Sequence, residues 1–306
     1  MAHREIVADN SANGNLQEVH TAQPLKETNW EVDFGIISQM EITLIKLGGS
    51  LITDKGRPYT ARPWTIRRLA KEIKRAIKGN SKLRLIIGNG GGSFPHVSAT
   101  KYGTANGYSG DEGKLGFCQV QNDAATINRL CVKIFLEEGI GTISVTPNNI
   151  FLTSNAKIAN FYIKNIEALL INGIIPFVYG DTLIDTVRGS CIYSCDQIME
   201  TLSQTLPQSK YKVNKIISVG DFPGVLDAQN SVVPLLNHQV FKRLIETRAI
   251  KKPSETDVTG GMKAKIETLL TEAKNGIESI ILDGRKPDNL YRTLMGKSFL
   301  GTTVKN

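Results

Sequence analysis

The sequence predicts an α/β fold built as a three-layer sandwich, in which a central, mainly parallel sheet lies between two layers of helices. Three observations support this prediction. From Glu41 onward, short apolar runs alternate with segments whose apolar residues recur every three or four positions. The apolar runs are largely continuous, as expected for strands that are buried on both faces. Glycine clusters follow two of these runs, where the loops of such sheets hold ligands.

The first half of the domain alternates regularly between strands and helices. Residues 42–47 are predicted as a strand, and residues 62–78 as a helix whose inner face carries Trp64, Ile66, Leu69 and Ile73. Strand 83–87 leads into a glycine-rich loop. A long helix, about 117–138, follows and stops at Gly139, because glycine favours the left-handed conformation that ends helices. Strand 142–146, helix 159–172 and strand 174–179 complete this half.

The second half continues the alternation after a hairpin. Residues 182–194 are predicted to form that hairpin and to turn at residues 187–189, where a glycine closes the turn. The remaining predicted elements are helix 196–206, strand 215–219, helices 240–247 and 261–274, strand 279–282 and helix 288–295.

Composition sets the class of protein. The chain has 41% apolar and 22% charged residues, which is ordinary for a soluble globular protein, and no apolar run approaches the roughly 20 residues that span a bilayer. The N-terminus lacks the pattern of a secretory signal, so a cytoplasmic location is expected. The four cysteines form no CxxC pair and lack a neighbouring histidine, which favours reduced thiols over a zinc site.

Charge separates the N-terminal segment from the rest. Residues 1–40 carry two basic and six acidic residues (2 − 6 = −4), so the remainder of the chain carries +8 − (−4) = +12. We interpret residues 1–40 as a flexible extension and residues 41–306 as the folded domain. A basic surplus favours polyanions or small phosphorylated ligands. The chain has no dense basic run with interleaved aromatic residues, so we expect phosphorylated metabolites and no nucleic-acid partner.

The most informative stretch is residues 88–96, Gly-Asn-Gly-Gly-Gly-Ser-Phe-Pro-His. Glycines at the end of a buried strand leave backbone N–H groups unshielded, so they can surround a phosphate. His96 closes the loop, and histidine can donate a hydrogen bond or a positive charge to a phosphate near neutral pH. These residues predict an anion site.

Two further segments carry the same chemistry. Lys46-Leu-Gly-Gly-Ser50 ends the first strand, with Lys55 a few residues on, and an ordinary strand end with a solvated lysine is the alternative interpretation. Residues 257–265, Asp-Val-Thr-Gly-Gly-Met-Lys-Ala-Lys, open a helix whose positive end suits an anion, while a capped helix with solvated lysines is the alternative. A Walker loop is excluded because Tyr291 stands where its first glycine is needed, and the dinucleotide fingerprint is incomplete.

These motifs together resemble the amino-acid-kinase superfamily and, within it, the isopentenyl phosphate kinase family. The resemblance covers residues 42–304. It rests on five motifs in order, which are Lys46-x-Gly-Gly-Ser50, Gly90-Gly-Gly-Ser-Phe-x-His96, Tyr179-Gly-Asp181, Ser194-x-Asp196 and Asp257-Val-Thr-Gly-Gly-Met262. Segment 116–123 also resembles the family's helix beside the isoprenoid tail. His96 distinguishes the subgroup, because this family and the related fosfomycin kinases use it to hold the acceptor phosphate or phosphonate.

The resemblance implies an ATP-dependent kinase that makes isopentenyl diphosphate from isopentenyl phosphate for isoprenoid biosynthesis, with Mg²⁺ carried by ATP, and a homodimer. It implies an acceptor lobe at about 41–206 and a nucleotide lobe at about 207–306. The implied catalytic residues are Lys46, Lys55, His96, Asp196 and Lys265. Those implied to bind the acceptor are Gly48, Gly49, Gly91, Gly92, His96 and Gly180. Those implied to bind the nucleotide are Lys46, Ser50, Asp221, Gly224, Thr259, Gly260, Lys263 and Lys265.

The sequence departs from the family pattern at Asn89, Pro95, Cys195 and Pro223. Pro95 restricts the backbone immediately before His96. A kinase for another small phosphate or phosphonate, such as fosfomycin, is the nearest alternative function. A non-catalytic sensor of nucleotide or phosphate is a second, and a dehydrogenase is a third.

Overall fold

The computed structural model describes residues 39–104, 107–247 and 261–306. Eight strands form the main sheet in this part of the chain. The strand order is β10-β12-β11-β9-β1-β2-β6-β3. Neighbouring strands are parallel except β11 and β12. The strands are β1 (Met40–Leu47), β2 (Leu85–Asn89), β3 (Thr142–Ser144), β6 (Ile175–Tyr179), β9 (Tyr211–Gly220), β10 (Leu235–Leu236), β11 (Glu278–Asp283) and β12 (Gly301–Val304).

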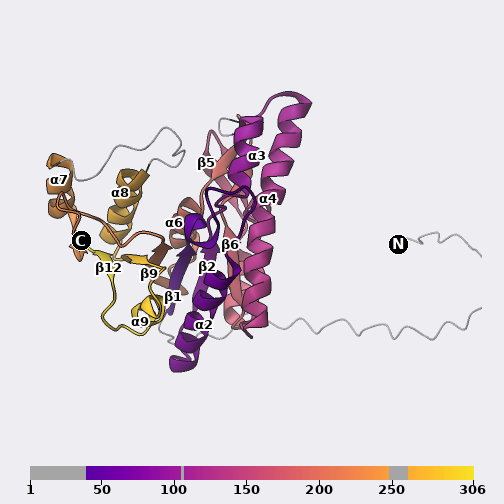
Figure 1. The fold of residues 1–306 in the computed structure, drawn as a ribbon. Helices are drawn as coiled ribbons and strands as arrows, with labels where there is room; N and C mark the ends of the chain where they lie inside the picture. Colours follow the sequence, from indigo (N-terminus) through magenta and orange to yellow (C-terminus); the bar gives the residue numbers. More distant parts are fainter. Residues whose placement is uncertain (1–38, 105–106, 248–260) are drawn as a thin grey trace, which may run out of the picture. The chain divides into compact units, whose positions relative to one another are not determined.

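Helices cover both faces of this sheet (Figure 1). Alternate side chains of β1 divide between the faces: Ile45 and Leu47 pack on one side, whereas Ile42 and Leu44 pack on the other. The first face is covered by α2 (Pro63–Gly79), α4 (Gly110–Glu137) and α9 (Asn289–Leu294). The second face is covered by α5 (Lys164–Ile171), α6 (Cys195–Thr205) and α8 (Gly261–Lys274). The predicted three-layer α/β fold is therefore confirmed.

The remaining elements flank this sandwich. Short helices α1 (Gly49–Ile52) and α3 (Pro95–Tyr102) follow β1 and β2, and α7 (His238–Glu246) packs with α8 and β12 in a third apolar cluster. A 3₁₀ turn spans Pro147–Asn149. A second sheet, in the order β5-β4-β7-β8, contains β4 (Phe151–Ser154), β5 (Lys157–Phe161), β7 (Asp181–Asp185) and β8 (Gly189–Tyr193). The hairpin predicted for residues 182–194 is confirmed as β7–β8.

The prediction of a helix over 159–172 was wrong in its first half. There the chain forms the β4–β5 hairpin, and helix α5 begins only at Lys164. The turn of this hairpin places Asn155 and Ala156 at positive φ, and both backbone N–H groups donate to the carboxylate of Asp185 at 3.0 and 2.7 Å. A contact from a strand 30 residues away therefore overrides the local helical pattern.

Three other expectations need correction on the first face. Trp64 is 84% exposed rather than inward, because it lies in the first turn of α2, ahead of the buried stripe. Helix α4 begins at Gly110, earlier than the expected residue 117. The end of the glycine-rich loop forms α3, which the sequence analysis did not predict.

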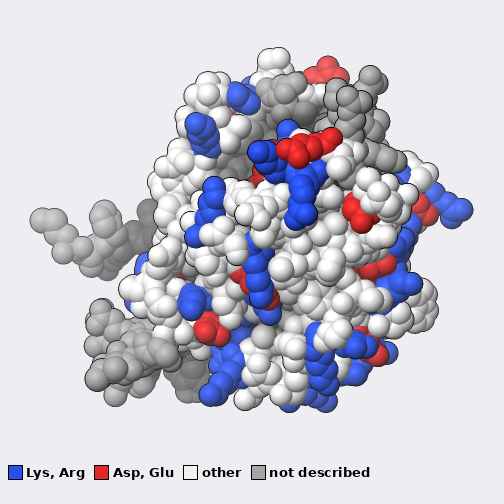
Figure 2. Space-filling model, turned by 90° about the vertical axis from the view of Figure 1, so that its left-hand side faces the viewer, with Lys and Arg blue, Asp and Glu red and all other residues white. Residues whose placement is uncertain are grey.

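The prediction of a flexible extension falls on residues 1–38, outside the described range, while Met40 already begins β1. The division into two lobes at residue 206 stays a prediction. Strands from both sides of that residue belong to one continuous sheet, because β9 pairs with β1 and β11 pairs with β9. In the described ranges, no helix is long and apolar enough to cross a membrane. Lysine and arginine side chains are scattered over the face shown in Figure 2, and several of them lie next to Asp or Glu side chains.

Candidate active site

The candidate site lies at the carboxyl ends of four adjacent strands, β9, β1, β2 and β6. Because these strands are parallel, the loops that follow them leave the sheet at the same edge. The predicted residues Gly48, Gly180 and Asp221 follow three of these strand ends directly, and the glycine motif that begins at Gly90 follows β2. The fold therefore brings the separate glycine motifs to one edge.

The first two glycine loops touch backbone to backbone. A Cβ added at Gly49 would lie 2.4 Å from the backbone nitrogen of Gly92, and one added at Gly90 would lie 2.8 Å from the nitrogen of Gly49. Gly92 also has a φ of +57°, which favours glycine. These glycines are required for the approach of the two loops, in addition to the anion binding for which the sequence singled them out.

Not every predicted glycine has a free N–H group. The N–H of Gly48 donates to the carbonyl of Val219 at 2.8 Å, and that of Gly180 donates to the carbonyl of Asn89 at 3.1 Å. By contrast, no hydrogen bond within the described residues uses the N–H groups of Gly49, Gly91 and Gly92. These three amides, at the contact between the loops, are the ones available to an anion.

Lys46 supplies a positive charge at the same edge of the sheet. Its ammonium, at the end of β1, forms an ion pair and hydrogen bond with the carboxylate of Asp196 in the first turn of α6. Burial is the largest single effect on the pKa of Lys46 and lowers it, but the charges of Asp196 and Cys195 and the hydrogen bond to Asp196 together outweigh burial, so the net pKa is raised above its ordinary value. Lys46 is therefore a cation throughout the neutral range, with its position set by Asp196.

The start of α6 explains how Asp196 is held. Ser194 caps this helix by accepting from the backbone of Gln197, whose side chain accepts in turn from the backbone of Ser194. Gly180 packs against the same turn, since a Cβ there would lie 2.8 Å from the nitrogen of Cys195. Asp181, next in the chain, is 3% exposed, and burial raises the pKa of its carboxyl to about 7.

On the β9 side, Ser50 contacts Asp221. The Ser50 hydroxyl donates to the Asp221 carboxylate at 2.7 Å. Gly224, three residues later, has a φ of +139° and packs against Thr302 of β12. The structure therefore joins Ser50 and Asp221, while the nucleotide-binding role of Gly224 stays a prediction.

His96 and Lys55 are both exposed, in the segments that follow β2 and β1. His96 occupies the first turn of α3, directly after Pro95, whose fixed φ suits a first helical position. Lys55 lies in the loop between α1 and α2.

Lys263, on α8, is half-exposed and pairs with Glu267 at 3.8 Å. Thr259 and Gly260 lie outside the described residues, as does the side chain of Lys265. The roles predicted for all these residues stay predictions.

The sequence analysis missed a set of residues that brace the loop carrying Lys55. Tyr59 donates from its hydroxyl to the buried carboxylate of Asp123 on α4 at 3.0 Å, and its ring packs edge-on against Phe94. The backbone nitrogens of Tyr59 and Thr60 donate to Ser93 of the glycine loop. No local pattern marks Tyr59, whose φ of +52° is set by these contacts.

Comparisons with known proteins agree with this geometry. The amino acid kinase family model matches residues 41–283. The isopentenyl phosphate kinase of Methanothermobacter thermautotrophicus is 32% identical over 85% of this chain and 98% of its own length. That of Methanocaldococcus jannaschii is 29% identical over 84% and 96%, respectively. A solved isopentenyl phosphate kinase superposes with a TM-score of 0.70 at 27% identity and covers 86% of this chain and 100% of its own. The chain therefore belongs to the amino acid kinase family and, within it, to the isopentenyl phosphate kinases.

Proposed function

We propose that this phosphotransferase moves the γ-phosphoryl group of ATP to isopentenyl phosphate and so forms isopentenyl diphosphate for isoprenoid biosynthesis. The observation that supports it most is the placement of Lys46, paired with Asp196, at the same edge of the sheet as the free amides of Gly49, Gly91 and Gly92. The identity of the acceptor is supported by the names of the relatives and by a histidine at the position where the family holds an acceptor phosphate.

The reaction joins two anions, so its barrier is lowered chiefly by positioning and positive charge. A terminal oxygen of the acceptor phosphate attacks the γ-phosphorus, and the bond to the β-phosphate oxygen breaks. The attacking oxygen is largely ionised at neutral pH and needs little help from a base. His96 is therefore assigned as a hydrogen-bond donor to the acceptor phosphate, and Lys46 as the cation that stabilises the transferring group. Lys265 is assigned the same role from the nucleotide side, and Lys55 steadies the phosphates.

Mg²⁺ is proposed to reach this site bound to the phosphates of ATP. Among the described residues, no group of three His, Cys, Asp or Glu side chains is placed to hold a metal ion. Bound to the ATP phosphates, the ion supplies charge neutralisation. Asp196 and Asp221 are two of the carboxylates at this edge, and both already accept hydrogen bonds, from Lys46 and Ser50.

An acceptor panel tests the proposal. Purified protein with Mg-ATP is given isopentenyl phosphate, fosfomycin or a small phosphate that lacks an apolar tail, each at the same concentration, and the phosphorylated product is measured. Isopentenyl phosphate is expected to react fastest. Preference for fosfomycin would assign the alternative kinase, and ATP binding without transfer to any acceptor would indicate a sensor.

The role of His96 is tested by His96→Ala, which removes the side-chain donor. Loss of one donor to a reacting oxyanion typically slows turnover by about 100-fold or more. His238→Ala, on α7, is the matched control, because His238 is also exposed and lies away from the site. Equal turnover by the two variants would refute the assigned role.

We also propose that the enzyme is a cytoplasmic homodimer with an acceptor lobe at 41–206 and a nucleotide lobe at 207–306. The four cysteines are all free thiols, which fits a reducing compartment. Light scattering coupled to size exclusion measures the oligomeric state.

A further inference from the structure

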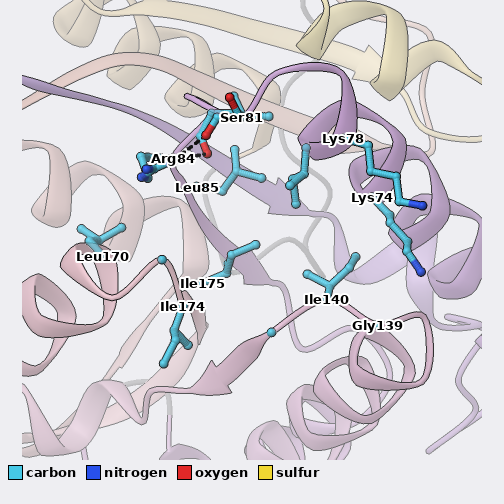
Figure 3. Close-up of a pocket in the computed structure, with 14 residues that line it drawn as sticks. Lys74, Lys78, Ser81, Arg84, Leu85, Gly139, Ile140, Leu170, Ile174 and Ile175 are labelled. Atoms are coloured by element: carbon cyan, nitrogen blue, oxygen red, sulfur yellow. Dashed lines mark hydrogen bonds between the residues drawn. The ribbon is translucent and has the colours of Figure 1, made fainter.

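A cavity of about 240 Å³ opens at the edge of the sheet opposite the candidate active site (Figure 3). It lies where β2 and β6 begin, between the last turns of α2 and the loops that precede β2, β3 and β6. Strand β2 has five residues, so about 16 Å of strand separates the cavity from the glycine loop. The reaction proposed above uses none of the side chains around it.

The floor of this cavity is aliphatic. Leu85, Ile140, Leu170 and Ile175 are buried, and Ile77, Leu83 and Ile174 complete the lining. Three glycines keep the rim open, and a Cβ added at Gly141 or Gly173 would meet no atom within 4 Å. An apolar chain can therefore enter without displacing a side chain at these two positions.

The rim is cationic. Lys74 and Lys78 lie on one side and Arg84 on the other, with Leu85 and Ile175 between them in the view of Figure 3. Lys74 donates to the carbonyl of Glu138 at 2.5 Å, and Arg84 donates to the carbonyl of Ser81 at 2.9 Å. Each retains further N–H donors. All fourteen lining residues are described, and none is acidic.

We infer that this cavity binds a short prenyl diphosphate, with the tail on the aliphatic floor and the diphosphate among Lys74, Lys78 and Arg84. Three cations without a carboxylate match a polyvalent head group better than a single carboxylate. The volume corresponds to about eight water molecules in the liquid, which suits a tail of about five carbons. The preference for an amphiphilic anion follows from the cavity, whereas the choice of a prenyl tail rests on the proposed function.

Methyl NMR of the full chain tests this inference, because isoleucines report on both edges of the sheet. The δ1-methyl groups of Ile77, Ile140, Ile174 and Ile175 line the cavity, whereas Ile52 lies in α1 beside the candidate active site. Isopentenyl diphosphate is titrated without ATP, with hexanoate and inorganic diphosphate in parallel. Saturable shifts of the four cavity methyl groups are expected with isopentenyl diphosphate, at least tenfold tighter than with either partial ligand.

The cationic rim is tested by substitution. Lys74→Gln combined with Arg84→Gln is expected to weaken binding at least tenfold. Lys78→Gln, at an exposed residue whose side chain has no hydrogen bond or ion pair in the described chain, is expected to weaken binding about threefold without disturbing the fold. Lys242→Gln on α7 is the matched control and should change nothing.

Shifts confined to Ile52, tighter binding of hexanoate, or unchanged affinity in the rim variants would each overturn the inference. The two proposals fail separately. Cavity shifts in a protein that does not phosphorylate isopentenyl phosphate would refute only the proposed function. Normal turnover without cavity shifts would refute only the cavity site.

Discussion

Replacing Gly92 by alanine tests the contact between the two glycine loops. The φ of +57° costs an L-residue roughly 1–2 kcal/mol. The new Cβ would also lie 2.0 Å from the Thr53 hydroxyl and 2.7 Å from the carbonyl of Gly49, so the loops must separate. That movement breaks the hydrogen bonds from the Thr53 hydroxyl to the Gly49 carbonyl and from the Ser93 nitrogen to Thr53. At about 0.5–1.5 kcal/mol each, they bring the total loss to about 2–5 kcal/mol.

Gly103→Ala is the matched control. Gly103 has nearly the same φ, +62°, but a Cβ there meets no atom within 4 Å. It therefore carries only the backbone cost of roughly 1–2 kcal/mol. The free energy of unfolding is measured by urea denaturation, and phosphoryl transfer is measured alongside. Gly92→Ala is expected to lose about 1–3 kcal/mol more than Gly103→Ala, together with most of its activity. Equal destabilisation of the two variants would refute the loop contact, and full activity of Gly92→Ala would refute its role in catalysis.

Three further predictions concern residues outside the glycine loops. Burial would raise the pKa of Asp185, but backbone N–H groups of two hairpin turns hold it well below its usual range. The ionised carboxylate therefore stabilises the fold at any pH above the pKa that Asp185 has in the unfolded chain. This contribution is lost as the pH falls through the pKa of Asp185 in the folded protein. Asp185→Asn should lower the free energy of unfolding at pH 7 by about 1–3 kcal/mol and flatten its decline below pH 4, and a parallel decline in both proteins would contradict this. Tyr59→Phe removes one hydrogen bond to Asp123 and should lower kcat with a stability loss of only about 1 kcal/mol, whereas unchanged kinetics would show that the brace is structural only. Burial raises the pKa of Glu272, so the contribution of its neutral form is present below the unfolded pKa and is lost as pH rises through the folded pKa. Glu272→Gln keeps a partner for Ser203 and should be at least as stable as the parent at pH 8, so a large loss of stability in thermal unfolding would refute this reasoning.

Local sequence patterns predicted most of the elements. Strands such as β1 and β6, and helices such as α6 and α8, agree with the predicted ranges to within a few residues, because their apolar spacing matches one period throughout. One failure occurs where a distant contact outweighs the local pattern, because Asp185 holds the turn of the β4–β5 hairpin at residues 155–156. The failure at Trp64 is different, because this residue lies in the first turn of α2, ahead of the buried stripe, and faces solvent.

The sequence by itself determined that the anion-binding motifs would meet at one edge of the sheet, because parallel strands place their carboxyl ends together. Only the tertiary structure decided which groups there are available. The N–H of Gly48 donates to the carbonyl of Val219 in β9, whereas no hydrogen bond in the described chain uses that of Gly49. The two residues are nevertheless adjacent and chemically identical. Lys46 and Asp196, 150 residues apart, become partners only when α6 packs beside β1. Hydrogen-bond partners depend on distances in space, which the spacing of residues along the chain does not contain.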